Sequence, residues 1–104
     1  AELPGEQLTK LAHRMRREEV GPGQPLLREG DEGDRFYVVL NGLLSVTQND
    51  RGLRRILKPG DYFGEVALAM DLPRTASVSP MTLSTVASCD RETFDEFIRP
   101  LFAE

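Results

Sequence analysis

Residues 63–78 read Phe-Gly-Glu-Val-Ala-Leu-Ala-Met-Asp-Leu-Pro-Arg-Thr-Ala-Ser-Val, and this stretch is the most informative part of the chain. It places a carboxylate, Glu65, directly after a glycine and a guanidinium, Arg74, directly after a proline. Both charges stand among small or apolar residues. An unpaired charge is costly to bury, so each of these groups needs a partner. A small ligand that carries one anionic group and several hydroxyl groups would satisfy both.

The first half of the stretch predicts a short helix over residues 65–70. Pro73 stops it, because proline lacks a backbone N–H and restricts the residue before it. Gly64 lets a ligand approach the backbone closely. The free N–H groups at the start of such a helix favour an anion.

The second half adds groups that suit a phosphate. Arg74 offers a planar fork of donors that matches phosphate oxygens. Thr75 and Ala76 are small enough for a phosphate to reach their amides. Glu65 can only accept hydrogen bonds, so it suits sugar hydroxyls. Together these groups indicate a nucleotide with one compact, singly charged phosphate.

Composition limits the class of protein. The chain has 104 residues, of which 39% are hydrophobic and 29% charged, as in a single globular domain. A net charge of -4 argues against general nucleic-acid binding. The single cysteine, Cys89, excludes an internal disulfide and favours the cytoplasm. No apolar run approaches the roughly 18 residues of a membrane helix, so no membrane contact is expected.

The rest of the chain predicts short strands separated by turn residues, as in an antiparallel sandwich or barrel. The strand-like runs cover residues 16–20, 26–29, 35–40, 43–48, 53–57, 75–79 and 83–89. Asn41-Gly42, between two apolar runs, is the strongest hairpin signal, since both residues tolerate positive φ.

Helices are predicted at both ends of the strand series. Apolar residues at helical spacing predict an amphipathic helix that ends near Met15. A second helix is expected from Asp90, as N-cap, to about Arg99. Pro100 should end or kink this helix.

The 63–78 stretch and the turns around it make the sequence resemble the cyclic nucleotide-binding domain family, above all the regulatory domains of cAMP- and cGMP-dependent protein kinases. The family's phosphate-binding cassette is matched by residues 63–68 and by Pro-Arg-Thr-Ala at 73–76. Upstream, residues 28–30 and 33–37 match the family's second turn and third strand. The resemblance covers nearly the whole chain.

The resemblance implies an α+β, mainly β fold: an eight-stranded antiparallel jelly-roll barrel. A single cyclic nucleotide-binding domain is expected over residues 1–104. It would consist of an N-terminal helix (1–15), a barrel (16–89) with the cassette at 63–78, and a hinge helix (90–104).

It also implies roles for particular residues. Glu65 would hold the ribose 2′-hydroxyl and Arg74 the cyclic phosphate. The ligand-binding residues expected in total are Gly64, Glu65, Val66, Ala67, Arg74, Thr75 and Ala76. The alternative is an ordinary salt bridge between Glu65 and Arg74, which would leave the glycines and small residues unexplained.

Base preference rests on two residues. Thr75 supplies the hydroxyl that cGMP-selective relatives often carry after the arginine, although cAMP-preferring relatives can carry one too. Arg55 resembles a guanine-contacting residue of cGMP-dependent kinases. Its alternative reading is an exposed arginine beside Arg54. Together they slightly favour cGMP over cAMP.

The function implied is a non-catalytic sensor that binds cGMP or cAMP, with no metal and no cofactor. It would control an effector in the same or a partner chain, most simply a cyclic-nucleotide-dependent kinase. A cupin-type metalloenzyme needs several converging histidines, and this chain has one. A cAMP-sensing transcription regulator would need a DNA-reading segment, which is not expected after residue 99; transporters and channels are further possible hosts.

Overall fold

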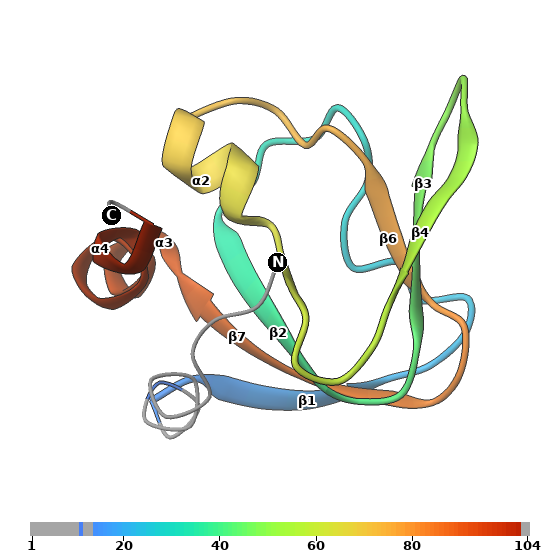
Figure 1. Ribbon diagram of the computed structural model, residues 1–104, viewed down its shortest axis with the longest axis horizontal. Helices are drawn as coiled ribbons and strands as arrows, with labels where there is room; N and C mark the ends of the chain where they lie inside the picture. The colour runs from blue at the N-terminus through green and yellow to red at the C-terminus, as the bar shows by residue number, and fades with distance from the viewer. Residues whose placement is uncertain (1–10, 12–13, 103–104) are drawn as a thin grey trace.

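The computed structural model describes residues 11 and 14–102, whose strands form two antiparallel sheets (Figure 1). The four-stranded sheet has the order β1 (Arg16–Val20), β7 (Ser84–Asp90), β2 (Arg35–Asn41) and β5 (Tyr62–Phe63). The three-stranded sheet has the order β4 (Gly52–Leu57), β3 (Leu44–Gln48) and β6 (Ser77–Pro80). The mainly β, antiparallel class is therefore confirmed.

The described helices lie outside the sheets (Figure 1). They are α2 (Glu65–Met70), α3 (Arg91–Thr93), the π-helix η1 (Phe94–Ile98) and α4 (Arg99–Phe102). The helix predicted over residues 1–15 falls almost entirely outside the described residues. Leu11 and Met15, which are described, are both buried.

Strand β2 is buried on both faces, which explains its continuous apolar sequence. Phe36 and Val38 face the helices, whereas Tyr37 and Val39 face the interior between the sheets, as the two-residue strand period requires. The helix-side cluster comprises Leu11, Met15, Phe36, Val38, Leu68, Ala87, Cys89, Phe94 and Ile98. The interior cluster comprises Val20, Leu27, Tyr37, Val39, Leu44, Leu57, Phe63, Val78 and Val86.

The expected count of eight strands is wrong for the described residues, which form seven. The run at 26–29 makes only one bridge, between Leu27 and Val78. A turn begins directly after Leu27, where the Asp31 N–H donates to the Arg28 carbonyl at 3.1 Å. The chain therefore leaves the sheet before a strand can form. Strand β5 escaped prediction because a two-residue strand is too short to show a period.

The hairpin expected at Asn41-Gly42 is also wrong, because the chain changes sheets there. Asn41 still pairs with Thr85 of β7, whereas the carbonyl of Leu43 accepts from the Met81 N–H at 2.8 Å, beside the other sheet. Gly42 has φ 87°, and a Cβ on it would lie 2.7 Å from the Cα of Ser84. The glycine is therefore needed for a close-packed corner.

The C-terminal helical segment begins as expected but does not end where expected. The carboxylate of Asp90 caps it by accepting from the Thr93 N–H at 2.8 Å. Pro100 does not end the helical segment, which continues to Phe102; it lies in the first turn of α4, directly after the π-helix. The wider π-turn before it closes with the N–H of Arg99 bonded to the carbonyl of Phe94.

Candidate functional site

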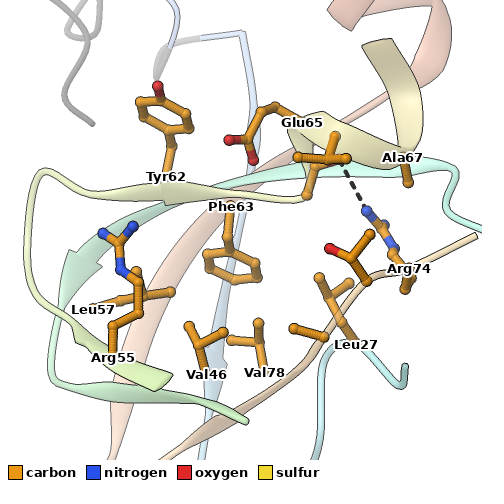
Figure 2. A pocket seen from close by; sticks show the side chains of 14 residues that line it. Leu27, Val46, Arg55, Leu57, Tyr62, Phe63, Glu65, Ala67, Arg74 and Val78 are labelled. Carbon is orange, nitrogen blue, oxygen red and sulfur yellow. Dashed lines mark hydrogen bonds between the residues drawn. The ribbon is translucent and has the colours of Figure 1, made fainter. Parts of the chain in front are cut away.

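A cavity of about 210 Å³ opens into the interior between the two sheets (Figure 2). All eight residues that the sequence nominated line it, including Arg55. The lining residues are Leu27, Val46, Arg55, Leu57, Tyr62, Phe63, Gly64, Glu65, Val66, Ala67, Arg74, Thr75, Ala76 and Val78. Residues from the middle of the chain and from the 63–78 stretch thus meet at one site.

The start of α2 forms one edge of this cavity and requires a glycine. Gly64 has φ 93°, a left-handed conformation that other residues rarely adopt. A Cβ at this position would lie 2.8 Å from the carbonyl oxygen of Arg35 and 3.0 Å from Nη1 of Arg74. The helix is anchored by the buried Ala67 and Leu68, so its first turn is fixed against the cavity.

Arg74 is 6% exposed, and its guanidinium is held by backbone carbonyls. Its Nη1 donates to the Gly64 carbonyl at 2.9 Å and its Nη2 to the Arg35 carbonyl at 2.8 Å. Its main chain pairs with the turn opposite, through Asp31 and Gly30, both at 2.8 Å. These bonds set the direction of the side chain while using only part of its fork of donors.

The guanidinium is a buried charge with no ion pair among the described residues. Burial lowers the pKa of Arg74, while the nearby Tyr37, Asp34 and Glu65 oppose that shift. An arginine stays protonated under such a shift. The salt bridge between Glu65 and Arg74, weighed as the alternative, does not form. The site therefore holds a fixed cation that can receive an anion.

Glu65 is half-buried in the first turn of α2. Its carboxylate lies above the apolar floor, between Tyr62 and Ala67 in Figure 2. Burial raises the pKa of Tyr62, and the Glu65 carboxylate adds to the rise. The cation and the acceptor therefore occupy different parts of one cavity.

The two residues expected near the base lie at the rim. The Arg55 side chain is 48% exposed, so it is an exposed arginine, yet it also lines the cavity. In Figure 2 it stands on the opposite side of the cavity from Arg74. Thr75 is exposed, and its carbonyl accepts from Nε2 of Gln48 at 3.0 Å.

Sequence reasoning missed the apolar floor and the groups that hold Arg74. The floor comes from Leu27, Val46, Leu57, Phe63 and Val78. Strand alternation marks these residues as inward-facing, but it does not show that they meet beneath a ligand site. No local signal marks the carbonyl of Arg35 as an acceptor for a residue 39 positions away.

Two small sheets enclose an apolar cavity that is also lined by the start of a helix and by a buried guanidinium, and this combination defines a domain that can bind a small anionic ligand. The chain belongs to the cyclic nucleotide-binding domain family, whose model matches residues 17–100. The family resemblance seen in the sequence is thus confirmed. Its relatives include a kinase regulatory subunit, and a solved structure of similar fold holds a cyclic nucleotide as its bound ligand.

Relatives include both kinds of kinase. The chain is 39% identical over 102 residues to a cAMP-dependent protein kinase regulatory subunit of Yarrowia lipolytica, covering 97% of this chain and 27% of the relative. It is 36% identical over 107 residues to the cGMP-dependent protein kinase egl-4 of Caenorhabditis briggsae, covering 97% of this chain and 14% of the relative. The chain thus spans less than a third of these relatives.

The fold agrees with solved structures. The cAMP-bound PfPKA-R (141-441) superposes with a TM-score of 0.84 at 26% identity, covering 95% of this chain and 35% of that one. These comparisons do not support the preference for cGMP drawn from Thr75 and Arg55. Among the described residues, no helix is long and apolar enough to cross a membrane.

Proposed function

We propose that this domain is a sensor that binds a 3′,5′-cyclic purine nucleotide in the cavity between α2 and the sheets. One observation carries the proposal. The buried, pre-oriented guanidinium of Arg74, the start of α2 and an apolar floor share a single cavity with Glu65.

The cyclic phosphate binds at Arg74, where the amides of the first turn of α2 and of Ala76 add donors. Charge-assisted bonds of this type are about twice as strong as neutral ones. The ribose hydroxyl donates to the carboxylate of Glu65. Gly64, Val66, Ala67 and Thr75 close around the phosphate and sugar.

The purine lies over the apolar floor, towards Arg55. Val46, Leu57 and Phe63 offer a surface on which the faces of adenine and guanine pack equally well. The contact that distinguishes the bases is therefore made at the rim. Both cAMP and cGMP are proposed as ligands, and relatives of both kinase types support this breadth.

The effector is proposed to be a protein kinase, in the same or a partner chain, and the working location the cytoplasm. The names of the relatives support a kinase as the effector.

Ligand binding is proposed to change the conformation of α3, η1 and α4, which pack against α2. A ligand can shift this segment only as far as its affinity differs between two states. Residues 1–104 are proposed to act as one binding unit.

Calorimetric titration with cAMP, cGMP and 5′-AMP tests the ligand class. The two cyclic nucleotides are expected to bind with one site per chain. 5′-AMP carries a second negative charge and a freely rotating phosphate. It should bind at least roughly tenfold more weakly, which corresponds to a loss of about 1.4 kcal/mol of binding free energy. Equal affinity for all three, or no binding of either cyclic nucleotide, contradicts the proposal.

A further inference from the structure

Asp61 is a buried carboxylate just outside the cavity, directly before β5. Its side chain is only 7% exposed. Its backbone is fixed on both sides, because its carbonyl accepts from the Val39 N–H at 2.8 Å and its own N–H donates to Lys58 at 3.0 Å. Its Oδ2 accepts from the backbone N–H of Lys58 at 2.9 Å. The carboxylate is therefore a rigid negative charge.

This charge faces the arginine at the rim of the cavity. Nη2 of Arg55 lies 3.9 Å from Oδ2 of Asp61, and Nζ of Lys58 lies 3.9 Å from Oδ1. The Arg55 side chain is half-exposed, so in isolation it would sample many rotamers. In the structure, the ion pair with this fixed carboxylate lies beside the cavity that Arg55 lines. Asp61 does not line the cavity itself, so any effect on a ligand passes through Arg55.

The chemistry of purine edges makes the placement of Arg55 important. Guanine presents two adjacent acceptors, N7 and O6, whereas adenine presents N7 beside an amino donor. An arginine fork bonds both acceptors of guanine but only one of adenine. A guanidinium held at the base end of the cavity therefore discriminates between the two purines.

We propose that Asp61 is a positioning residue that sets the base preference of the site by holding Arg55. The inference rests on the proposed function, because it needs a cyclic purine nucleotide in the cavity. Neutralising Asp61 frees the Arg55 fork, and the relative affinity for the guanine ligand falls.

The test compares affinities for cGMP and cAMP, by calorimetry, in wild type and in Asp61→Asn, Arg55→Gln and the double variant. Asparagine can still accept from the backbone N–H of Lys58, so the turn is retained. Arg55→Gln is expected to move the affinity ratio towards cAMP by roughly tenfold, the effect of losing one bidentate base contact. Asp61→Asn should move it the same way by roughly threefold, as for a half-exposed ion pair. Arg54→Gln, on the same strand, is the matched control and should leave the ratio unchanged.

In the double variant, Asp61→Asn should add nothing to the effect of Arg55→Gln, because the positioned group is gone. Three results would overturn the inference: an unchanged ratio in Asp61→Asn, equal losses for both nucleotides, or the same shift in the Arg55→Gln background. If Asp61→Asn fails to fold, added salt serves instead. Salt screens the ion pair between Asp61 and Arg55. In wild type, the affinity for cGMP relative to cAMP should therefore fall as salt is added, whereas in Arg55→Gln it should stay constant. An equal response in both proteins also overturns the inference.

The two proposals fail differently. If wild type binds neither nucleotide, the proposed function is wrong. If wild type binds cyclic nucleotides but Asp61→Asn leaves the ratio of the cGMP and cAMP affinities unchanged, only the positioning role is wrong.

Discussion

At the scale of single residues, the site depends on how closely the backbone surrounds Arg74. A Cβ on Gly33 would lie 2.6 Å from Cζ of Arg74 and 2.6 Å from Cβ of Ala67. A Cβ on Gly64 would lie 3.0 Å from Nη1 of Arg74. With two backbone carbonyls as acceptors, this packing presets the arginine before any ligand arrives.

Replacement of Arg74 by alanine should cost at least ~3 kcal/mol of binding free energy, roughly a hundredfold in Kd. The variant removes the only group proposed to carry the phosphate charge. Calorimetry with cAMP measures the change, and Arg54→Ala is the control for loss of charge. A thermal melt is run beside it, because Arg74 also bonds Gly64 and Arg35. Undiminished affinity in a folded Arg74→Ala protein would exclude the assigned role.

Replacement of Gly33 by alanine should lower the free energy of unfolding by about 1–3 kcal/mol, as overpacking does, and weaken nucleotide binding by displacing Arg74. Gly21→Ala is the matched control, because the nearest atom to a Cβ there is 3.8 Å away. Urea unfolding of both variants gives the comparison. Equal stability of the two variants would show that the tight packing around Arg74 is unimportant.

The residue scale also shows what a sequence can and cannot predict. Glu65 and Arg74 were identifiable because the cassette is local: both lie within one stretch of sixteen residues. The Arg35 carbonyl was not, because it accepts from Arg74, a residue 39 positions away that it meets only in the folded chain.

At the scale of elements, the C-terminal helices hold the end of α2. Nη1 of Arg91 donates to the Leu68 carbonyl at 3.3 Å. Arg99 donates to the same carbonyl at 2.9 Å and to that of Ala69 at 3.1 Å. Last-turn carbonyls lack helical partners, and cations are favoured beside them. The cassette helix and the segment proposed to carry the signal are thus joined by hydrogen bonds.

We therefore expect nucleotide binding to change amide hydrogen exchange across residues 91–102. Arg99→Gln should reduce that change, because it removes two of the bonds to α2, each worth about 1 kcal/mol. Arg51→Gln, in the exposed turn between β3 and β4, should leave the exchange pattern as in wild type. Identical exchange with and without saturating nucleotide would contradict a signal path through this segment.

Elements were predictable where the pattern is local and were not where tertiary contacts decide. Helix α2 and the apolar strands β2 and β7 follow from periodicity, length and the proline that comes after α2. The corner at Asn41-Gly42 has the sequence of a hairpin, yet its strands join different sheets because each finds a better partner elsewhere. Pro100 stays within the helical segment because the π-turn before it resets the hydrogen-bond pattern.

At the scale of the whole molecule, the two apolar clusters have different roles: one holds the helices and the other forms the floor of the cavity. The cluster on the helix side fixes α2 and the C-terminal helices to the outer face of the sheet, through Leu68, Phe94 and Ile98. The interior cluster supplies the floor of the cavity through Leu27, Phe63 and Val78. A ligand in the cavity therefore contacts the barrel interior and the start of α2 together.

The central claim is that this cavity is where a cyclic nucleotide binds. The most direct measurement is titration of the ¹⁵N-labelled domain with cAMP, followed by amide chemical shifts. We expect saturable changes, largest at residues 64–67 and 74–76, where the ligand would meet the backbone. An absence of saturable changes, or changes confined to residues that do not line the cavity, such as the exposed Leu43 and Leu83, would contradict the claim.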